Sequence, residues 1–201
     1  VLAGAGINLE RYKMQPYPKH TRIHFLYLGR IMKEKGIDEL FYAVRHLKKE
    51  NENFVLDLVG FFEDEYKEQV KELEKHSIAH FYGFQPDPRP FYIEADCVVL
   101  PSYHEGMSNV LLEAAATGRP VITSNIPGCR ESVENGKSGL LVEVKNKEML
   151  YDAMKEMLHC SREEREQMGQ AGREKMEREF RKEVVVEKTV QSLREDEKRD
   201  F

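Results

Sequence analysis

Residues 97–125 read CVVLPSYHEGMSNVLLEAAATGRPVITSN, and this stretch decides the fold. It starts with an apolar run that ends in Pro and Ser, and a polar loop then leads into a helical segment at 108–117. A second apolar run follows at 120–125. Strands that alternate with helices are joined by right-handed crossovers, which place the strands side by side in a parallel sheet. The stretch therefore predicts one strand–helix–strand unit.

The same alternation extends over most of the chain. Four more apolar runs are candidate strands, at 23–29, 54–60, 79–84 and 139–144. Several of the six runs end in Gly, Pro or Ser, where a chain turns out of a sheet. Apolar residues at helical spacing predict an amphipathic helix of about four turns between the first two strands, and further helices are expected at 63–76, 147–158 and 161–179. The pattern predicts an α/β fold with a Rossmann-like, doubly wound parallel sheet, and a frayed, solvated tail at 194–201.

Composition narrows the class of protein. A chain of 201 residues with 40% hydrophobic and 33% charged residues is a globular domain rather than a disordered or membrane-embedded one. Its net charge of −5 argues against a broadly basic surface for nucleic acid. Cys97, Cys129 and Cys160 lack ligand-like spacing, and no secretory segment is evident, so we expect three inert buried thiols and a cytoplasmic location.

Three motifs that would indicate a nucleotide or zinc site are absent or incomplete. No GxxxxGK[ST] loop is present, which argues against a Walker-type nucleotide triphosphatase. AGAG (3–6) lacks the third glycine and the following helix of a dinucleotide fingerprint, so we expect a hinge or linker there. HSIAH (76–80) runs from a helix end into a strand, so its two histidines would not share a helical face as zinc ligands do.

The first strand leads into GRIMKEKG (29–36). Gly29 permits a sharp exit from the sheet, and Arg30 and Lys35 flank the expected start of a helix. Two cations beside free backbone N–H groups could clamp a phosphate. The alternative is that both are ordinary solvated charges.

HEGMSNVLLE (104–113) places two acids around a helix start. Ser108 or Asn109 is suited to cap that helix, with Glu105 before it and Glu113 inside it. Eight residues of helix span about 12 Å, which exceeds the roughly 5–9.5 Å that separates the carboxyl groups of glycosidases. The acids could instead bracket an elongated ligand such as a nucleotide-sugar, with its diphosphate at the helix amides. Helix-capping and surface acids remain the alternative reading.

Several segments in order carry a resemblance to a known family: GRIMKEKG, LDLVG, HFYGF, LPSYHEGMSNVLLEAAATGRPVI and GCRESVENGKSGLLV. Together they resemble the C-terminal half of the GT-B glycosyltransferases, specifically the large retaining family four. The match spans most of residues 23–158. It implies an interdomain segment at 1–22, a donor-binding Rossmann-like domain at 23–160, and C-terminal helices with a charged tail at 161–201. An N-terminal acceptor domain would lie outside this chain, which begins at Val1 without a methionine.

The resemblance also implies roles for individual residues. Glu105 would support charge near the anomeric carbon, Glu113 would hold the ribose hydroxyls, and Arg30 and Lys35 would clamp the diphosphate. The amides of Ser108, Asn109 and Val110 would meet the distal phosphate, and the stretch around Phe84 would lie by the base. The expected donor contacts also include Gly29, Gly106 and Met107. No DxD occurs in the sequence, so neither a metal nor another cofactor is expected, and the two cations take the place of a metal.

The function implied is a retaining hexosyltransferase that uses a nucleotide-sugar, with UDP as the expected nucleotide. The acceptor would be a glycan or a polyprenyl-diphosphate-linked sugar, since AGAGINLERY and the following Tyr-Pro pair resemble bacterial proteins that build capsule and related polysaccharides. This chain alone is expected to bind donor without transferring sugar, and the missing domain could bring it to the inner face of the membrane. Alternatives are a GT-B sugar-nucleotide 2-epimerase and a non-catalytic binding module. His104 and the tail beyond Phe180 depart from the family pattern.

Overall fold

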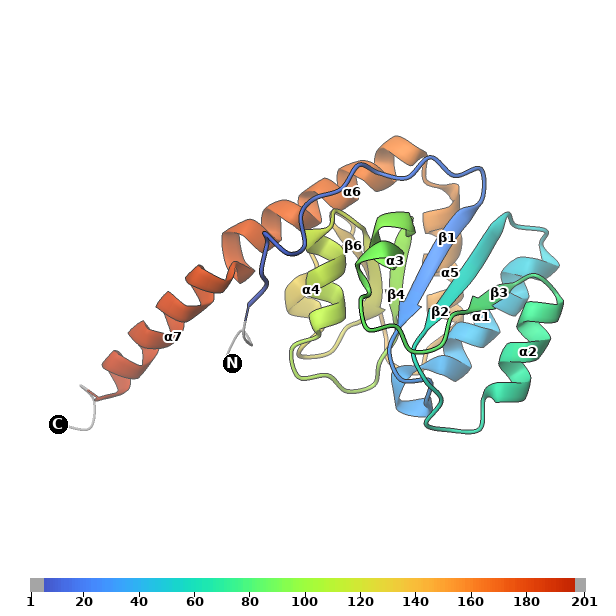
Figure 1. Ribbon diagram of the computed structural model, residues 1–201, viewed down its shortest axis with the longest axis horizontal. Helices are drawn as coiled ribbons and strands as arrows, with labels where there is room; N and C mark the ends of the chain where they lie inside the picture. The colour runs from blue at the N-terminus through green and yellow to red at the C-terminus, as the bar shows by residue number, and fades with distance from the viewer. Residues whose placement is uncertain (1–5, 198–201) are drawn as a thin grey trace.

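The computed structural model describes residues 6–197. Most of the AGAG segment and the last four residues of the expected tail therefore lie outside the described residues. Within them, the chain forms one parallel α/β sheet with helices on both of its faces (Figure 1).

The sheet has six strands in the order β3-β2-β1-β4-β5-β6, and all of its pairings are parallel. The strands are β1 (Ile23–Leu28), β2 (Phe54–Val59), β3 (Ala79–Phe81), β4 (Cys97–Leu100), β5 (Val121–Ser124) and β6 (Gly139–Val142). All six predicted strands and the doubly wound arrangement are confirmed, but each strand ends one to three residues before its predicted end. β3 is the shortest because the chain turns away at Gly83, whose φ of 67° lies in the left-handed region.

The helices in chain order are α1 (Ile37–Lys49), α2 (Lys67–Lys75), α3 (Arg89–Glu94), α4 (Asn109–Ala116), α5 (Lys147–His159), α6 (Arg162–Lys175) and α7 (Lys182–Glu197). α3 was not predicted, because it has only six residues and prolines stand at its N-cap and in its first turn, at Pro88 and Pro90. α2 starts four residues later than predicted. The reason is that the backbone N–H groups of Glu63 and Asp64 bond to the carbonyl of Ile31, which holds this loop against the end of β1.

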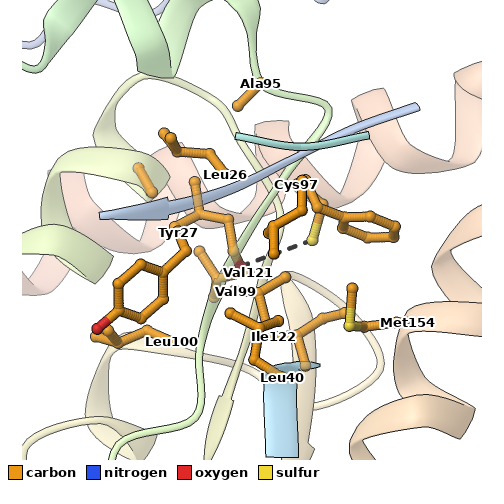
Figure 2. Close-up of a cluster of buried hydrophobic side chains, with 14 of the residues drawn as sticks. Leu26, Tyr27, Leu40, Ala95, Cys97, Val99, Leu100, Val121, Ile122 and Met154 are labelled. Atoms are coloured by element: carbon orange, nitrogen blue, oxygen red, sulfur yellow. Dashed lines mark hydrogen bonds between the residues drawn. The ribbon is translucent and has the colours of Figure 1, made fainter. Parts of the chain in front are cut away.

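The hydrophobic core lies on both sides of the central strands. Figure 2 shows Leu26 and Tyr27, consecutive residues of β1, among buried side chains of β4 and β5. α1 packs beside α5, and α4 packs beside α6. A parallel sheet covered in this way buries both faces, which explains why its strands read as continuous apolar runs rather than as alternating ones.

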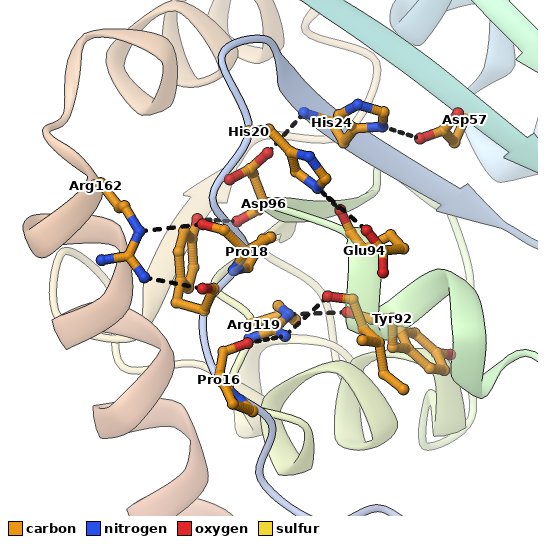
Figure 3. A network of polar contacts seen from close by, with 12 residues as sticks. Pro16, Pro18, His20, His24, Asp57, Tyr92, Glu94, Asp96, Arg119 and Arg162 are labelled. Carbon is orange, nitrogen blue, oxygen red and sulfur yellow. Dashed lines mark hydrogen bonds and ion pairs between the residues drawn. The ribbon is translucent and has the colours of Figure 1, made fainter.

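A buried arginine fastens the N-terminal segment, residues 6–22, to the amino edge of the sheet (Figure 3). The Arg119 side chain is fully buried, and this removal from water lowers its pKa to about 10. Its guanidinium donates to backbone carbonyls of two remote segments, at Gln15 and Pro16 and at Tyr92 and Ile93, and to that of the preceding Gly118. From α6, Arg162 donates to the carbonyls of Tyr17 and Pro18. No local pattern in the sequence marks Arg119 for this role.

The C-terminal part differs from the prediction in two ways. The helix expected at 161–179 is α6 followed by a π-helix, η3 (Met176–Phe180). Residues 194–197, expected to be a frayed tail, continue α7. Their composition explains this, because Arg and Glu are good helix formers. α7 extends away from the body of the domain in Figure 1, and none of the described helices has the length and apolar character needed to cross a bilayer.

Candidate functional site

A pocket opens where the strand order reverses, at the carboxyl ends of β1 and β4. In open α/β sheets this reversal creates a crevice in which ligands bind. The pocket has a volume of about 290 Å³. It is lined by Leu28, Gly29, Arg30, Lys35, Leu100, Glu105, Met107, Ser108, Asn109 and Val110. Most of the predicted site residues are therefore brought together, although 70 residues separate Lys35 from Glu105 in the sequence.

Lys35 and Glu105 form an ion pair inside this pocket. Lys35 Nζ lies 2.5 Å from Glu105 Oε1, and the two side chains are only 16% and 15% exposed. The Ser102 hydroxyl donates to the same carboxylate oxygen at 2.8 Å. The two loops that carry the pair are in close contact, because a Cβ at Gly36 would lie 2.2 Å from the carbonyl oxygen of Pro101. Glycine is therefore required where the β1 loop meets the β4 loop.

Arg30 has a different environment from Lys35. Its side chain is 48% exposed and pairs with Glu63 at 2.8 Å, outside the Lys35–Glu105 contact. Its backbone is held by the Tyr27 hydroxyl, which donates to the Arg30 carbonyl at 2.5 Å. The prediction that both cations flank a helix start needs correction. A short 3₁₀ helix, η1 (Lys33–Lys35), lies between Arg30 and the beginning of α1.

The third component of the pocket is the amino end of α4. Ser108 occupies the N-cap position, as predicted, but its side chain makes no capping hydrogen bond. Its backbone N–H instead bonds to the carbonyl of Gly128 at 3.0 Å. A Cβ at Gly128 would lie 1.5 Å from the Gly106 carbonyl oxygen, so this second loop packs directly against the first. The first amides of α4 have no partner within the helix and can bind an anion.

Glu113 and Phe84 lie outside the pocket lining, as does Gly106, which is exposed in the loop between Glu105 and Met107. The Glu113 carboxylate accepts a hydrogen bond from the Tyr92 hydroxyl of α3 at 2.9 Å. Burial raises the pKa of Glu113, and the hydroxyl groups of Tyr12 and Tyr92 partly oppose that rise. Phe84 follows β3 and is 68% exposed. The two acids of HEGMSNVLLE thus have separate surroundings, with Glu105 in the loop before α4 and Glu113 inside that helix.

Sequence reasoning missed three residues that shape the site: Ser102, Tyr92 and Gly128. Ser102 was noticed only as part of a strand end, and no local pattern indicated its contact with Glu105. Tyr92 belongs to the unpredicted α3. Gly128 follows a proline in a turn, a signal that would have marked the loop but not its contact with Gly106.

The remaining candidates behave as structural features. His76 ends α2 and His80 lies in β3, which confirms that they do not share a helical face. Cys97 and Cys129 are buried, but Cys160 is partly exposed, so the expectation of three buried thiols was wrong for that residue. Within residues 6–197, no group of three or more His, Cys, Asp or Glu side chains is arranged to hold a metal ion.

The sequence model of the family "Glycosyl transferases group 1" matches residues 10–175. The chain belongs to this family. Among curated relatives of this group 1 domain, the capsular polysaccharide biosynthesis glycosyltransferase CapM of Staphylococcus aureus is 28% identical over 90% of this chain and 50% of its own length. An N,N'-diacetylbacillosaminyl-diphospho-undecaprenol alpha-1,3-N-acetylgalactosaminyltransferase of Campylobacter jejuni is 30% identical over 73% of this chain and 41% of its own length.

The group 1 domain spans about half the length of the curated relatives it matches. Its fold is also that of Anabaena HepE, solved in complex with UDP and glucose. The two share a TM-score of 0.78 and 20% identity over 94% of this chain and 55% of that one. This likeness shows the fold alone, and it agrees with the predicted Rossmann-like fold.

Proposed function

We propose that this domain binds a nucleotide-sugar donor for a glycosyltransferase. The main support for this proposal is that Lys35, Glu105 and the amino end of α4 line one pocket, at the point where the strand order of the sheet reverses. A diphosphate carries negative charge that suits the lysine and the helix amides, and the carboxylate beside them suits the sugar.

The charges of the pocket match those that develop when the anomeric C–O bond breaks. Negative charge grows on the departing nucleoside diphosphate, where Lys35, Arg30 and the amides of Asn109 and Val110 would stabilise it. The expected contact from the Ser108 amide needs correction, because that N–H donates to the Gly128 carbonyl. Positive charge grows on the sugar, where Glu105 would stabilise it. Groups already held in place stabilise a transition state without reorganising, which makes this kind of stabilisation a large part of catalysis. A front-face departure with retained anomeric configuration is the mechanism we propose.

The base and ribose would extend from the pocket towards α3 and the loop after β3. Glu113 lies one helical turn beyond Asn109 and would accept hydrogen bonds from the ribose hydroxyls. Phe84, exposed beside this path, would lie by the base. Gly29, Gly106 and Met107 would complete the donor contacts of the loops after β1 and β4.

The relatives support a more specific version of this proposal. CapM is named for capsular polysaccharide biosynthesis, the Campylobacter jejuni relative for N-acetylgalactosaminyl transfer to a diphospho-undecaprenol-linked sugar, and HepE was solved with UDP. We therefore propose UDP as the nucleotide, a hexose or N-acetylhexosamine as the sugar, and a glycan or lipid-linked acceptor. Acceptor binding would involve parts of the protein beyond this chain. Arg30 and Lys35 would replace a divalent metal, so donor binding should survive EDTA.

Calorimetry with a nucleotide series tests the donor site. UDP should bind more tightly than UMP, and UMP about as weakly as uridine, because the second phosphate reaches Lys35 and the α4 amides. Glu113→Ala should weaken UDP binding about tenfold, since it removes a hydrogen-bonded carboxylate. The matched control is Glu156→Ala, an exposed acid on α5, which should bind UDP as the wild type does. If the wild type binds neither UDP nor GDP, the proposal is refuted.

A panel of donors and acceptors tests the reaction itself. The longest natural protein that contains this sequence should release nucleotide from one donor only when an acceptor is present. Interconversion of free donor without acceptor would identify an epimerase instead. UDP binding without consumption of any donor across the panel would identify a non-catalytic module.

A further inference from the structure

Glu105 receives two hydrogen bonds on one oxygen, and the two donors differ in mobility. Lys35 reaches Oε1 from the end of η1 through a flexible four-carbon side chain, whereas Ser102 reaches the same oxygen with a one-carbon side chain. The proposed function assigns Lys35 to the diphosphate. A lysine that turns towards a phosphate no longer bonds fully to Glu105, so the carboxylate then depends on its other donor.

Ser102 is enclosed by the protein. It is fully buried, and it lies two residues beyond the end of β4. The next residue, Tyr103, donates its backbone N–H to the Glu34 carbonyl at 2.8 Å, and its hydroxyl bonds to Glu39 at 2.9 Å. Contacts on the α1 side therefore anchor the chain directly after Ser102, which leaves its hydroxyl little freedom to follow a moving partner.

We infer that Ser102 is a positioning residue, whose hydroxyl keeps the Glu105 carboxylate beside the sugar when Lys35 turns to the diphosphate. This inference rests on the proposed function. A carboxylate that is free to rotate would stabilise positive charge at the anomeric carbon less well, because it must be oriented during the reaction. The hydroxyl thus acts through Glu105 and needs no contact with the substrate.

Substitution of Ser102 by alanine tests whether this residue positions Glu105 or only supports the fold. In the longest natural protein containing this sequence, Ser102→Ala should lower kcat about tenfold, the effect of losing one hydrogen bond to a charged group, with UDP affinity within about twofold of wild type. In a Glu105→Gln background the same change should have little further effect, and in a Lys35→Met background it should keep its full effect. Thr123→Val removes another buried hydroxyl at this edge of the sheet, one that bonds to the Leu100 carbonyl, and should leave kcat within about twofold.

Two results would overturn the inference. One is a double variant, Ser102→Ala with Glu105→Gln, whose loss of kcat equals the product of the two single losses. A residue that acts through Glu105 cannot give this result, because its effect depends on the Glu105 carboxylate. The other is an equal loss of UDP affinity and kcat, which would indicate a structural role. If Ser102→Ala does not fold, a crystal structure of the wild-type chain with UDP decides. In that structure, Lys35 should contact a phosphate while the Ser102 hydroxyl still donates to Glu105. If UDP is bound but the Ser102–Glu105 hydrogen bond is absent, the inference is refuted and the proposed donor site still stands. Failure of the wild type to bind UDP refutes the proposed function instead.

Discussion

The two edges of the sheet each hold a cation removed from bulk solvent, but its partners differ. At the amino edge, Arg119 is surrounded by backbone carbonyls that cannot move without unfolding the N-terminal segment or α3. At the carboxyl edge, Lys35 pairs with Glu105, a side chain beside a pocket. A cation with fixed partners specifies a structure, and a cation with a side-chain partner remains available to a ligand.

The same difference extends to the neighbours of each cation. His24 and Asp96 at the amino edge bond to backbone or to buried groups, with the His24 N–H donating to Asp96 at 2.9 Å (Figure 3). At the carboxyl edge, the amides of α4 and the guanidinium of Arg30 face the pocket or solvent. We therefore expect substitutions at the amino edge to change stability and substitutions at the carboxyl edge to change binding.

The largest effect is expected at Arg119. Arg119→Met should lower the free energy of unfolding by about 3–5 kcal/mol, because it leaves several buried carbonyls without a donor and loosens the N-terminal segment. Urea denaturation measures this change. The control is Arg89→Met, whose exposed guanidinium pairs with Asp87 and whose loss should change the free energy of unfolding far less. An Arg119→Met variant as stable as the control would break the comparison, since the amino edge would then tolerate loss of its central cation.

The next effect is expected at Lys35 and should appear in binding. Lys35→Met should weaken UDP binding about 30-fold, or about 2 kcal/mol, since it removes a charged donor from the phosphate. The free energy of unfolding should fall less than in Arg119→Met, because Ser102 still bonds to Glu105 and the carboxylate lies beside a pocket.

Lys33→Met is the matched control for Lys35, because it removes an exposed lysine from the same short helix. It should leave calorimetric UDP affinity unchanged. If Lys35→Met instead destabilises the fold as strongly as Arg119→Met and leaves UDP binding intact, the two edges do not differ in the way proposed.

The smallest effect concerns pH and the amino edge. The hydrogen bond to Asp57 raises the pKa of His24 above its ordinary value of 6.5, against a smaller opposing contribution from burial. A raised folded-state pKa means that the protonated form stabilises the fold. This contribution is complete below about pH 6.5 and is lost as the pH rises through the folded-state pKa. Asp96, with a pKa raised by burial, adds to the same trend at lower pH.

His24→Gln should remove that part of the pH dependence, an effect of less than about 1 kcal/mol for a partly exposed pair. Urea denaturation at a series of pH values from 5.5 to 8.5 measures it, with His76→Gln as the exposed-histidine control. An unchanged pH profile in His24→Gln would show that the His24–Asp57 contact is not coupled to folding. UDP affinity should be unaffected in both variants, which separates the amino edge from the pocket.

Much of the fold follows from local patterns in the sequence. Apolar runs separated by amphipathic helices predicted all six strands and the parallel sheet, because strand and helix periodicities are read over a few residues. α3 escaped notice because its six residues carry too few turns to show a period, and proline masked its start. The late start of α2 depends on contacts with Ile31, about 30 residues away, which no local pattern contains.

For the site, the sequence by itself determined which residue types gather at the carboxyl edge. Gly29, Arg30, Glu105 and Ser108 each follow a strand, and parallel strands end at one edge. Only the tertiary structure decided which of these groups bond to one another. Lys35 and Ser102 both bond to Glu105, Glu113 turns to Tyr92, and Arg119 binds carbonyls more than 100 residues away. The physical reason is that side-chain partners depend on distances between segments remote in sequence, whereas strands and helices depend on neighbours along the chain.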